Sequence, residues 1–186
     1  MGMTREVADA LLKKYVQDER MLNHSYASEA VMRALARHLG QNEETWGLAG
    51  LLHDLDIELV RGDLSIHGLE AARILTEEGI DPEVVDAVKM HNDMVAGIKR
   101  LTVFHHALAA GETITGLISA TALVYPDKKL SSVKVKSITK RMKEKAFAAS
   151  VRRDNILECE IIGIPLNEFA SIALEAMKNI HEQLGL

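Results

Sequence analysis

A histidine beside an aspartate closes an apolar stretch of the chain. Residues Gly47–Asp56 read GLAGLLHDLD, in which His53 and Asp54 follow a run of small and aliphatic residues. Burying these two polar groups is costly unless something binds them. Imidazole and carboxylate are suitable ligands for divalent transition metals, so a bound ion is one way to stabilise such a segment.

Three more histidines lie near the ends of predicted helices. His24 and His67 lie close to helix starts, and His91 lies at a helix end. Any one of them taken alone is ordinarily a hydrogen-bonded core or surface residue. Their order favours convergence, because helix ends can meet at a shared cavity while the helix bodies form a rigid wall. Asp54 has two carboxylate oxygens and can bridge two ions.

The composition favours helices as the elements that position these groups. The chain has 186 residues, 47% of them hydrophobic, with only three prolines and 4% aromatic residues. Ala, Leu, Ile, Glu and Lys dominate, which predicts an all-α fold. Apolar spacing at three and four residues predicts helices over 4–16, 22–39, 43–55, 66–78, 82–91, 101–110, 113–124, 131–148, 154–162 and 166–184.

The length suffices for one domain with a sizeable core. We expect a single compact helical bundle over residues 1–186, with a C-terminal helical extension from about residue 130 to 186 packed on the same core. The last predicted helix carries a broad apolar stripe, which completes a core or, alternatively, pairs subunits in an oligomer. The stripe consists of Leu166, Phe169, Ile172, Ala173, Ala176, Met177, Ile180 and Leu184.

Several functional classes lack support in the sequence. The longest apolar runs fall short of the ~20 residues that span a bilayer, and the first residues lack the apolar core of a signal peptide. The single cysteine, Cys159, rules out an intrachain disulfide and a Cys-rich zinc site. The net charge of −5 and the scarcity of aromatic residues argue against nucleic-acid recognition. We therefore expect a cytoplasmic protein without membrane contact.

Positive charge is concentrated in residues 128–153, which contain ten lysines and arginines. One interpretation is a solvated helix face, and the other is a positive rim that attracts an anionic ligand. The candidates for phosphate contact are Lys128, Lys129, Arg152 and Arg153. Arginine is the first choice because its fork of N–H groups matches phosphate oxygens.

The order of these groups resembles the HD-domain superfamily of metal-dependent phosphohydrolases. That family's pattern is a histidine, a histidine–aspartate pair, further histidines and an acidic residue. The matching positions here are His24, His53, Asp54, His67, His91 and Glu112. The stretches HGLEAARIL and HND, and the segment 113–156, are similar to single-domain members of the HDIG type. The resemblance extends over residues 22–177 and is more specific than an isolated HD pair.

The resemblance implies a metal-dependent phosphohydrolase with one or two divalent ions. Family members hydrolyse phosphate esters, commonly of nucleotides, with a metal-bound water as the nucleophile. It makes Asp54 and His53 the central catalytic residues. The first ion would be held by His24, His53, Asp54 and Glu112, and the second by Asp54, His67 and His91. Mixed nitrogen and oxygen ligands suit Mn, Fe, Co, Ni or Zn, and the substrate would be a small phosphorylated molecule.

Two departures from the family pattern leave alternatives open. Glu112 stands where the family usually has an aspartate, and Asp56 follows His-Asp-Leu where the subgroup has His-Asp-Ile-Gly. Asp56 either caps the following loop or orients a ligand histidine. His105 precedes Glu112 by two helical turns and is a further candidate ligand, as its neighbour His106 is. A non-catalytic metal- or nucleotide-binding regulatory module is the alternative to an enzyme.

Overall fold

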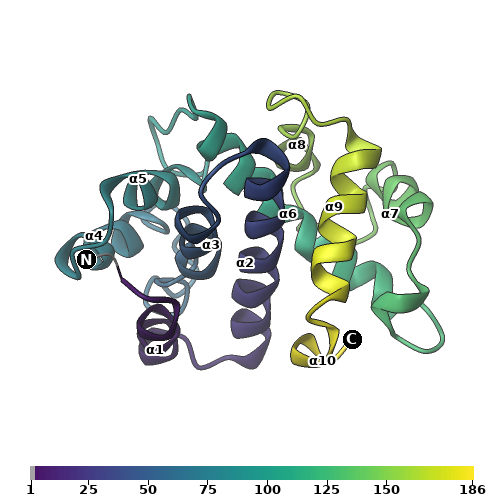
Figure 1. Ribbon diagram of the computed structural model, residues 1–186, viewed down its shortest axis with the longest axis horizontal. Helices are drawn as coiled ribbons and strands as arrows, with labels where there is room; N and C mark the ends of the chain where they lie inside the picture. The colour runs from purple at the N-terminus through teal and green to yellow at the C-terminus, as the bar shows by residue number, and fades with distance from the viewer. Residues whose placement is uncertain (1–2) are drawn as a thin grey trace.

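The computed structural model describes residues 3–186, and this part of the chain contains helices and no strand (Figure 1). The all-α prediction is therefore confirmed. The α-helices are α1 (Arg5–Tyr15), α2 (Glu19–Leu39), α3 (Glu43–Leu52), α4 (Leu69–Glu77), α5 (Pro82–Met90), α6 (Val103–Leu123), α7 (Val135–Met142), α8 (Arg153–Leu157), α9 (Leu166–Lys178) and α10 (His181–Leu184). A short 3-10 helix, η1 (Leu130–Ser132), follows α6. Within the described residues, none of these helices is both long and apolar enough to span a bilayer.

Local capping chemistry sets several helix boundaries where the sequence predicts them. Helix α2 ends as predicted, at Gly40 in the left-handed region at φ 66°. Helix α5 begins as predicted, after Asp81, which accepts the Glu83 N–H, with Pro82 in the first turn. These two ends depend on short-range features, so a single sequence suffices to locate them. The start of α2 lies three residues before the predicted residue 22, after Asp18, whose side chain accepts the Arg20 backbone N–H.

The predicted break between residues 110 and 113 is wrong, because α6 runs unbroken through Gly111. This glycine serves close packing and does not end the helix. A Cβ atom at Gly111 would lie 3.0 Å from the Met32 sulfur and 3.2 Å from a Leu35 methyl carbon of α2. Its absence lets the two longest helices approach each other closely, which outweighs the low helix propensity of glycine.

The C-terminal helices are shorter than predicted. Helix α7 covers only part of 131–148, α8 covers only the start of 154–162, and the stretch 166–184 divides into α9 and α10. A tertiary contact accounts for the end of α7. The Arg153 guanidinium donates to the five backbone carbonyls of Arg141, Glu144, Phe147, Ala148 and Val151. These carbonyls thereby gain partners without continuing the helix.

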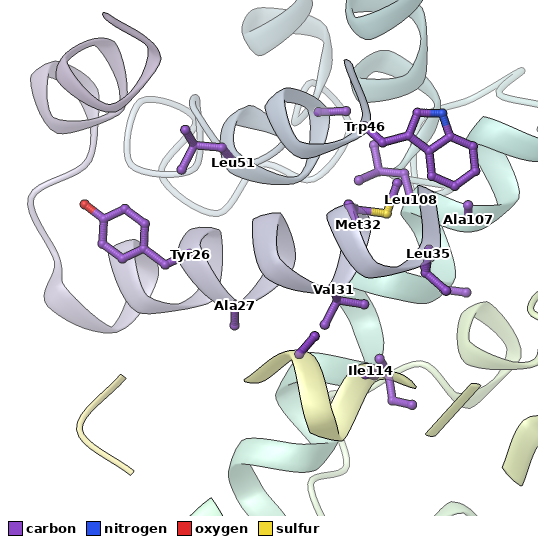
Figure 2. Close-up of a cluster of buried hydrophobic side chains, with 14 of the residues drawn as sticks. Tyr26, Ala27, Val31, Met32, Leu35, Trp46, Leu51, Ala107, Leu108 and Ile114 are labelled. Carbon is purple, nitrogen blue, oxygen red and sulfur yellow. The ribbon is translucent and has the colours of Figure 1, made fainter. Parts of the chain in front are cut away.

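Helix α2 lies at the centre of the molecule and packs against α3, α6 and α9 (Figure 1). Trp46 of α3 stacks on Phe104 of α6, with ring centroids 5.0 Å apart. Figure 2 shows part of the core, in which α2 contributes Tyr26, Ala27, Val31, Met32 and Leu35, α3 contributes Trp46 and Leu51, and α6 contributes Ala107, Leu108 and Ile114. The same hydrophobic cluster includes Phe169, Ala173 and Met177 of α9, so much of its apolar stripe is used within the chain.

Candidate metal centre

The six residues that the sequence nominates as metal ligands come together at one place. His24 lies in α2 and Glu112 in α6, while His53 ends α3 and is followed by Asp54. His67 precedes α4, and His91 ends α5. Except for His24, which is 22% exposed, the side chains are at most 15% exposed. Four helices and the segment between α3 and α4 therefore deliver imidazoles and carboxylates to a largely buried centre.

The histidines face one another through their Nε2 atoms. The Nε2 atoms of His24 and His53 lie 3.1 Å apart, and those of His67 and His91 also lie 3.1 Å apart. Asp54 lies between the two pairs. Its Oδ2 is 3.4 Å from His24, and its Oδ1 lies 3.4, 3.1 and 3.5 Å from Nε2 of His53, His67 and His91.

The opposite ring nitrogens are engaged by acceptors, which determines where the protons lie. Nδ1 of His53 is 2.8 Å from the Gly50 carbonyl, and Nδ1 of His91 is 2.6 Å from the Val88 carbonyl. A carbonyl only accepts, so both Nδ1 atoms donate. Nδ1 of His67 likewise faces a carboxylate oxygen of Asp56 at 2.7 Å. In their neutral forms these three rings direct a free Nε2 lone pair into the centre.

His24 follows the same rule through a hydroxyl group. The Thr115 hydroxyl donates its single proton to the Glu112 carbonyl at 2.6 Å, and its oxygen lies 2.9 Å from Nδ1 of His24. The hydroxyl must therefore accept from His24 Nδ1, so Nε2 of His24 also carries a lone pair. Thr115 gave no signal at the sequence level, because an isolated threonine in a helix has no distinguishing neighbours.

The spacing of the donor atoms matches a set of metal ligands. Ligands about 2.1 Å from one transition-metal ion lie about 3.0 Å apart at right angles and about 3.4 Å apart at tetrahedral angles. The observed separations between the imidazole nitrogens and Asp54 run from 3.1 to 3.5 Å. Facing lone pairs at these distances repel unless a proton or a metal cation lies between them. Two overlapping sets have all donor atoms within 4.8 Å, namely His24, His53 and Glu112, and His53, Asp54 and His91.

The electrostatics of the centre also favour a cation. Burial opposes ionisation of Asp54, yet the neighbouring His53, His67 and His91 hold the pKa of that carboxyl well below its usual range. Burial likewise opposes protonation of His67, but hydrogen bonds to Asp54 and Asp56 raise the pKa of His67 to about 10. In the metal-free protein a proton on Nε2 of His67 supplies positive charge that an ion would otherwise bring, so ion binding must displace that proton.

Asp56 has both roles that its position in the sequence allows. Its Oδ1 accepts from His67 Nδ1, while its Oδ2 accepts the backbone N–H groups of Gly68 and Ala71 at 2.8 and 2.9 Å. Asn92, which the sequence analysis did not single out, adds a second restraint by donating to the His67 carbonyl at 3.0 Å. In the sequence, only the position of Asn92 directly after His91 indicated that it could have a role at the centre.

A cavity of about 270 Å³ opens over the centre and is bordered by His24, Asp54, His67, His91 and Glu112. Residues 150–152 and Asn155 also line it. Of the four candidate phosphate contacts, Arg152 alone lines this cavity, where its Nη2 lies 3.0 Å from an oxygen of Asp93. Lys128 and Lys129 lie beyond the end of α6, outside the cavity lining within residues 3–186, and the Arg153 guanidinium is occupied by backbone carbonyls.

His105 and His106 have other partners. Nε2 of His105 lies 2.7 Å from Asp86, and its Nδ1 accepts the Leu101 backbone N–H at 3.2 Å. His106 pairs with Glu158 at 2.8 Å. The hypothesis that His105 adds a ligand is therefore wrong, because both of its ring nitrogens are used at the N-terminus of α6.

Burial raises the pKa of the Cys159 thiol to about 11, which leaves it a poor nucleophile.

Fold and site together define an all-α domain whose helix ends converge on a histidine and carboxylate cluster suited to divalent ions. A family model described as HD domain matches residues 21–118, which is more than half of the chain. The chain belongs to the HD-domain family. Neither the curated proteins nor the solved structures include a match to this chain. All six candidate ligands lie inside the matched residues, whereas the cavity wall from 150 to 155 lies outside them.

Proposed function

We propose that this protein is a metal-dependent phosphohydrolase that cleaves a phosphate ester of a small molecule. The observation that carries the proposal is the set of four imidazoles whose Nδ1 atoms are held by acceptors, so that their four Nε2 atoms face each other and Asp54 and can bind ions once His67 has lost its Nε2 proton. Membership of the HD-domain family supports it, since the members of this superfamily are generally metal-dependent hydrolases.

Two ions suit the donor set better than one. The pair His24 and His53, with Glu112, offers one group of donors, and the pair His67 and His91 offers another. Asp54 lies near both groups, with Oδ2 facing His24 and Oδ1 facing His53, His67 and His91, so both groups could share it. Nitrogen and carboxylate donors select Mn, Fe, Co, Ni or Zn over Ca or Mg. Bound ions would lower the pKa of a water molecule and neutralise charge on the phosphate.

The protein's own residues would bind and orient the ester. The Arg152 guanidinium lies at the cavity wall and is 47% exposed, so it can turn from Asp93 to a phosphate oxygen at little cost. The cavity volume of about 270 Å³ suits a small ester such as a nucleotide mono- or diester. Burial of the carboxylates and imidazoles lowers the local dielectric, which strengthens their interaction with charge.

The alternative is a regulatory module that binds metal or nucleotide without turnover. Two departures from the family pattern favour this alternative, namely Glu112 in place of the usual aspartate and the altered HDIG motif. The geometry around Glu112 argues against it, because a carboxylate oxygen lies 3.6 Å from His24 Nε2 despite the extra methylene. Asp56, the other departure, orients a ligand histidine.

Two measurements test the proposal in sequence. Elemental analysis of protein made without an affinity tag is expected to find one or two transition-metal ions per chain. A panel of nucleotides, cyclic nucleotides and aryl phosphates, assayed with each metal, is then expected to reveal phosphate release. Metal binding without release from any ester would favour the regulatory module, and turnover that persists after all metal is removed would refute the mechanism.

A further inference from the structure

A buried arginine lies directly behind the ligand His91. Arg100 is 8% exposed, and its Nη1 donates to the backbone carbonyls of Met90 and His91 at 3.3 and 3.1 Å. These carbonyls terminate α5, where the helix can no longer supply its own donors. Arg100 therefore caps the helix end that carries a candidate metal ligand.

Arg100 is itself held by the C-terminal part of the chain. Its Nε lies 3.0 and 2.9 Å from the two carboxylate oxygens of Glu158, and its Nη2 donates to Glu158 and to the amide oxygen of Asn155. Glu158 also pairs with His106 of α6. A forked arginine–carboxylate pair with further partners is among the strongest polar contacts, because several charge-assisted bonds fix one geometry.

The position of the His91 ring depends on this helix end. His91 Nδ1 bonds to the Val88 carbonyl in the same final turn, so a shift of that turn would carry Nε2 with it. After His91 the chain enters the segment 92–102, which contains no helix to continue α5. Asn92 ties the start of this segment to the Leu64 and His67 carbonyls, and the Arg100 guanidinium ties the last turn of α5 to Glu158 and Asn155.

We propose that Arg100 is a positioning residue for His91, and that Glu158 and Asn155, which lie outside the family-matched residues, hold Arg100 in place and so complete the metal centre. The proposal rests on the proposed metal-binding function. It assigns a role to the C-terminal segment in ion binding, in addition to its place in the cavity wall.

The test compares ion binding in metal-free wild-type protein and in Arg100→Gln, Arg100→Lys and Glu158→Gln variants. Titration with Co²⁺, followed by calorimetry and visible absorption, resolves the binding steps, and His91→Ala identifies the step that depends on His91. Removing a group that orients a ligand costs about 10- to 100-fold in metal affinity. We expect this loss in Arg100→Gln at the His91 step, with the other step changed less than about threefold.

The conservative variant and a matched control separate positioning from general stability. Arg100→Lys keeps the charge but loses the fork, so its affinity should lie between those of wild type and Arg100→Gln. Arg33 forms a comparable forked pair with Glu44 and a second bond to Glu29, away from the cavity, so Arg33→Gln should leave both steps unchanged. If Arg100→Gln does not fold, Arg100→Lys and Glu158→Gln provide the same comparison.

Each outcome bears on a defined claim. Wild-type affinity at the His91 step in Arg100→Gln, or in both remaining variants if that one does not fold, would overturn the positioning role while leaving the metal centre intact. Equal weakening of both steps, matched by Arg33→Gln, would reduce Arg100 to a stability residue. Absence of Co²⁺ binding to the wild-type protein would overturn this proposal and the proposed function together.

Discussion

Replacing Asp56 by asparagine should change which nitrogen of His67 carries the proton. The Asp56 side chain is fully buried, and its Oδ2 accepts two backbone N–H groups while its Oδ1 accepts from His67. In Asp56→Asn the amide oxygen is expected at the Oδ2 position, because two donors point there. The amide nitrogen would then face His67 Nδ1 and donate to it, which moves the imidazole proton to Nε2.

The consequence for the metal centre follows from this tautomer change. A protonated Nε2 has no lone pair for an ion, so the ion near His67 must either lose that ligand or drive an unfavourable rearrangement of the amide. We expect metal affinity to fall by about 10- to 100-fold, or about 1.4 to 2.7 kcal/mol, as for other groups that orient a ligand histidine. The hydrolysis rate at limiting metal should fall with it.

Two readouts follow the change in Asp56→Asn. Zn²⁺ titration of metal-free protein measures affinity, and ¹⁵N NMR of the imidazole nitrogens at a pH where His67 is neutral reports its tautomer directly. Asp63→Asn is the matched control, because Asp63 is an exposed residue of the same interhelical segment that caps Ser65. Unchanged affinity in Asp56→Asn, together with a proton still on Nδ1 of His67, would refute the reasoning.

Three further predictions concern the centre and its rim. Asp54→Ala should abolish metal binding and turnover together, whereas Glu112→Asp should keep part of both. Glu112→Gln should weaken metal binding without unfolding the helical core. Elemental analysis measures metal content, the hydrolysis rate measures turnover and circular dichroism measures folding; wild-type metal content in Glu112→Gln would contradict its role as a ligand. The pKa of His67 is raised from 6.5 to about 10, so the contribution of protonated His67 to the stability of the metal-free protein is complete below pH 6.5 and is lost as the pH rises toward 10. The unfolding temperature, measured with chelator present, should therefore fall over that range. A drop of equal size in His67→Gln would disprove the assignment to His67. Arg152→Ala should raise KM about tenfold or more with a smaller effect on kcat, whereas the exposed Lys134→Ala should change neither, and equal KM values in the two variants would remove Arg152 from substrate binding.

Helical content, several helix boundaries and the six candidate ligands could be predicted from the sequence. The reason is that these features are encoded over short distances: Gly40 adopts a left-handed conformation at a helix end, and Asp81 caps the turn that begins with Pro82. The order of histidines and acidic residues along the chain can also be recognised from the sequence alone, because it is a pattern of residue types. That pattern identified the six candidate ligands, whereas their convergence at one place is a property of the fold.

Only the tertiary structure decided the roles that depend on contacts between distant residues. Gly111 reads locally as a helix breaker, yet the close approach of α2 makes it a packing residue inside α6. Arg152 and Arg153 are equivalent neighbours in the sequence, but one lines the cavity and the other binds backbone carbonyls. The Arg100–Glu158 pair joins residues 58 positions apart. Such pairings are selected by the packing of the whole bundle, which residue type and spacing do not specify.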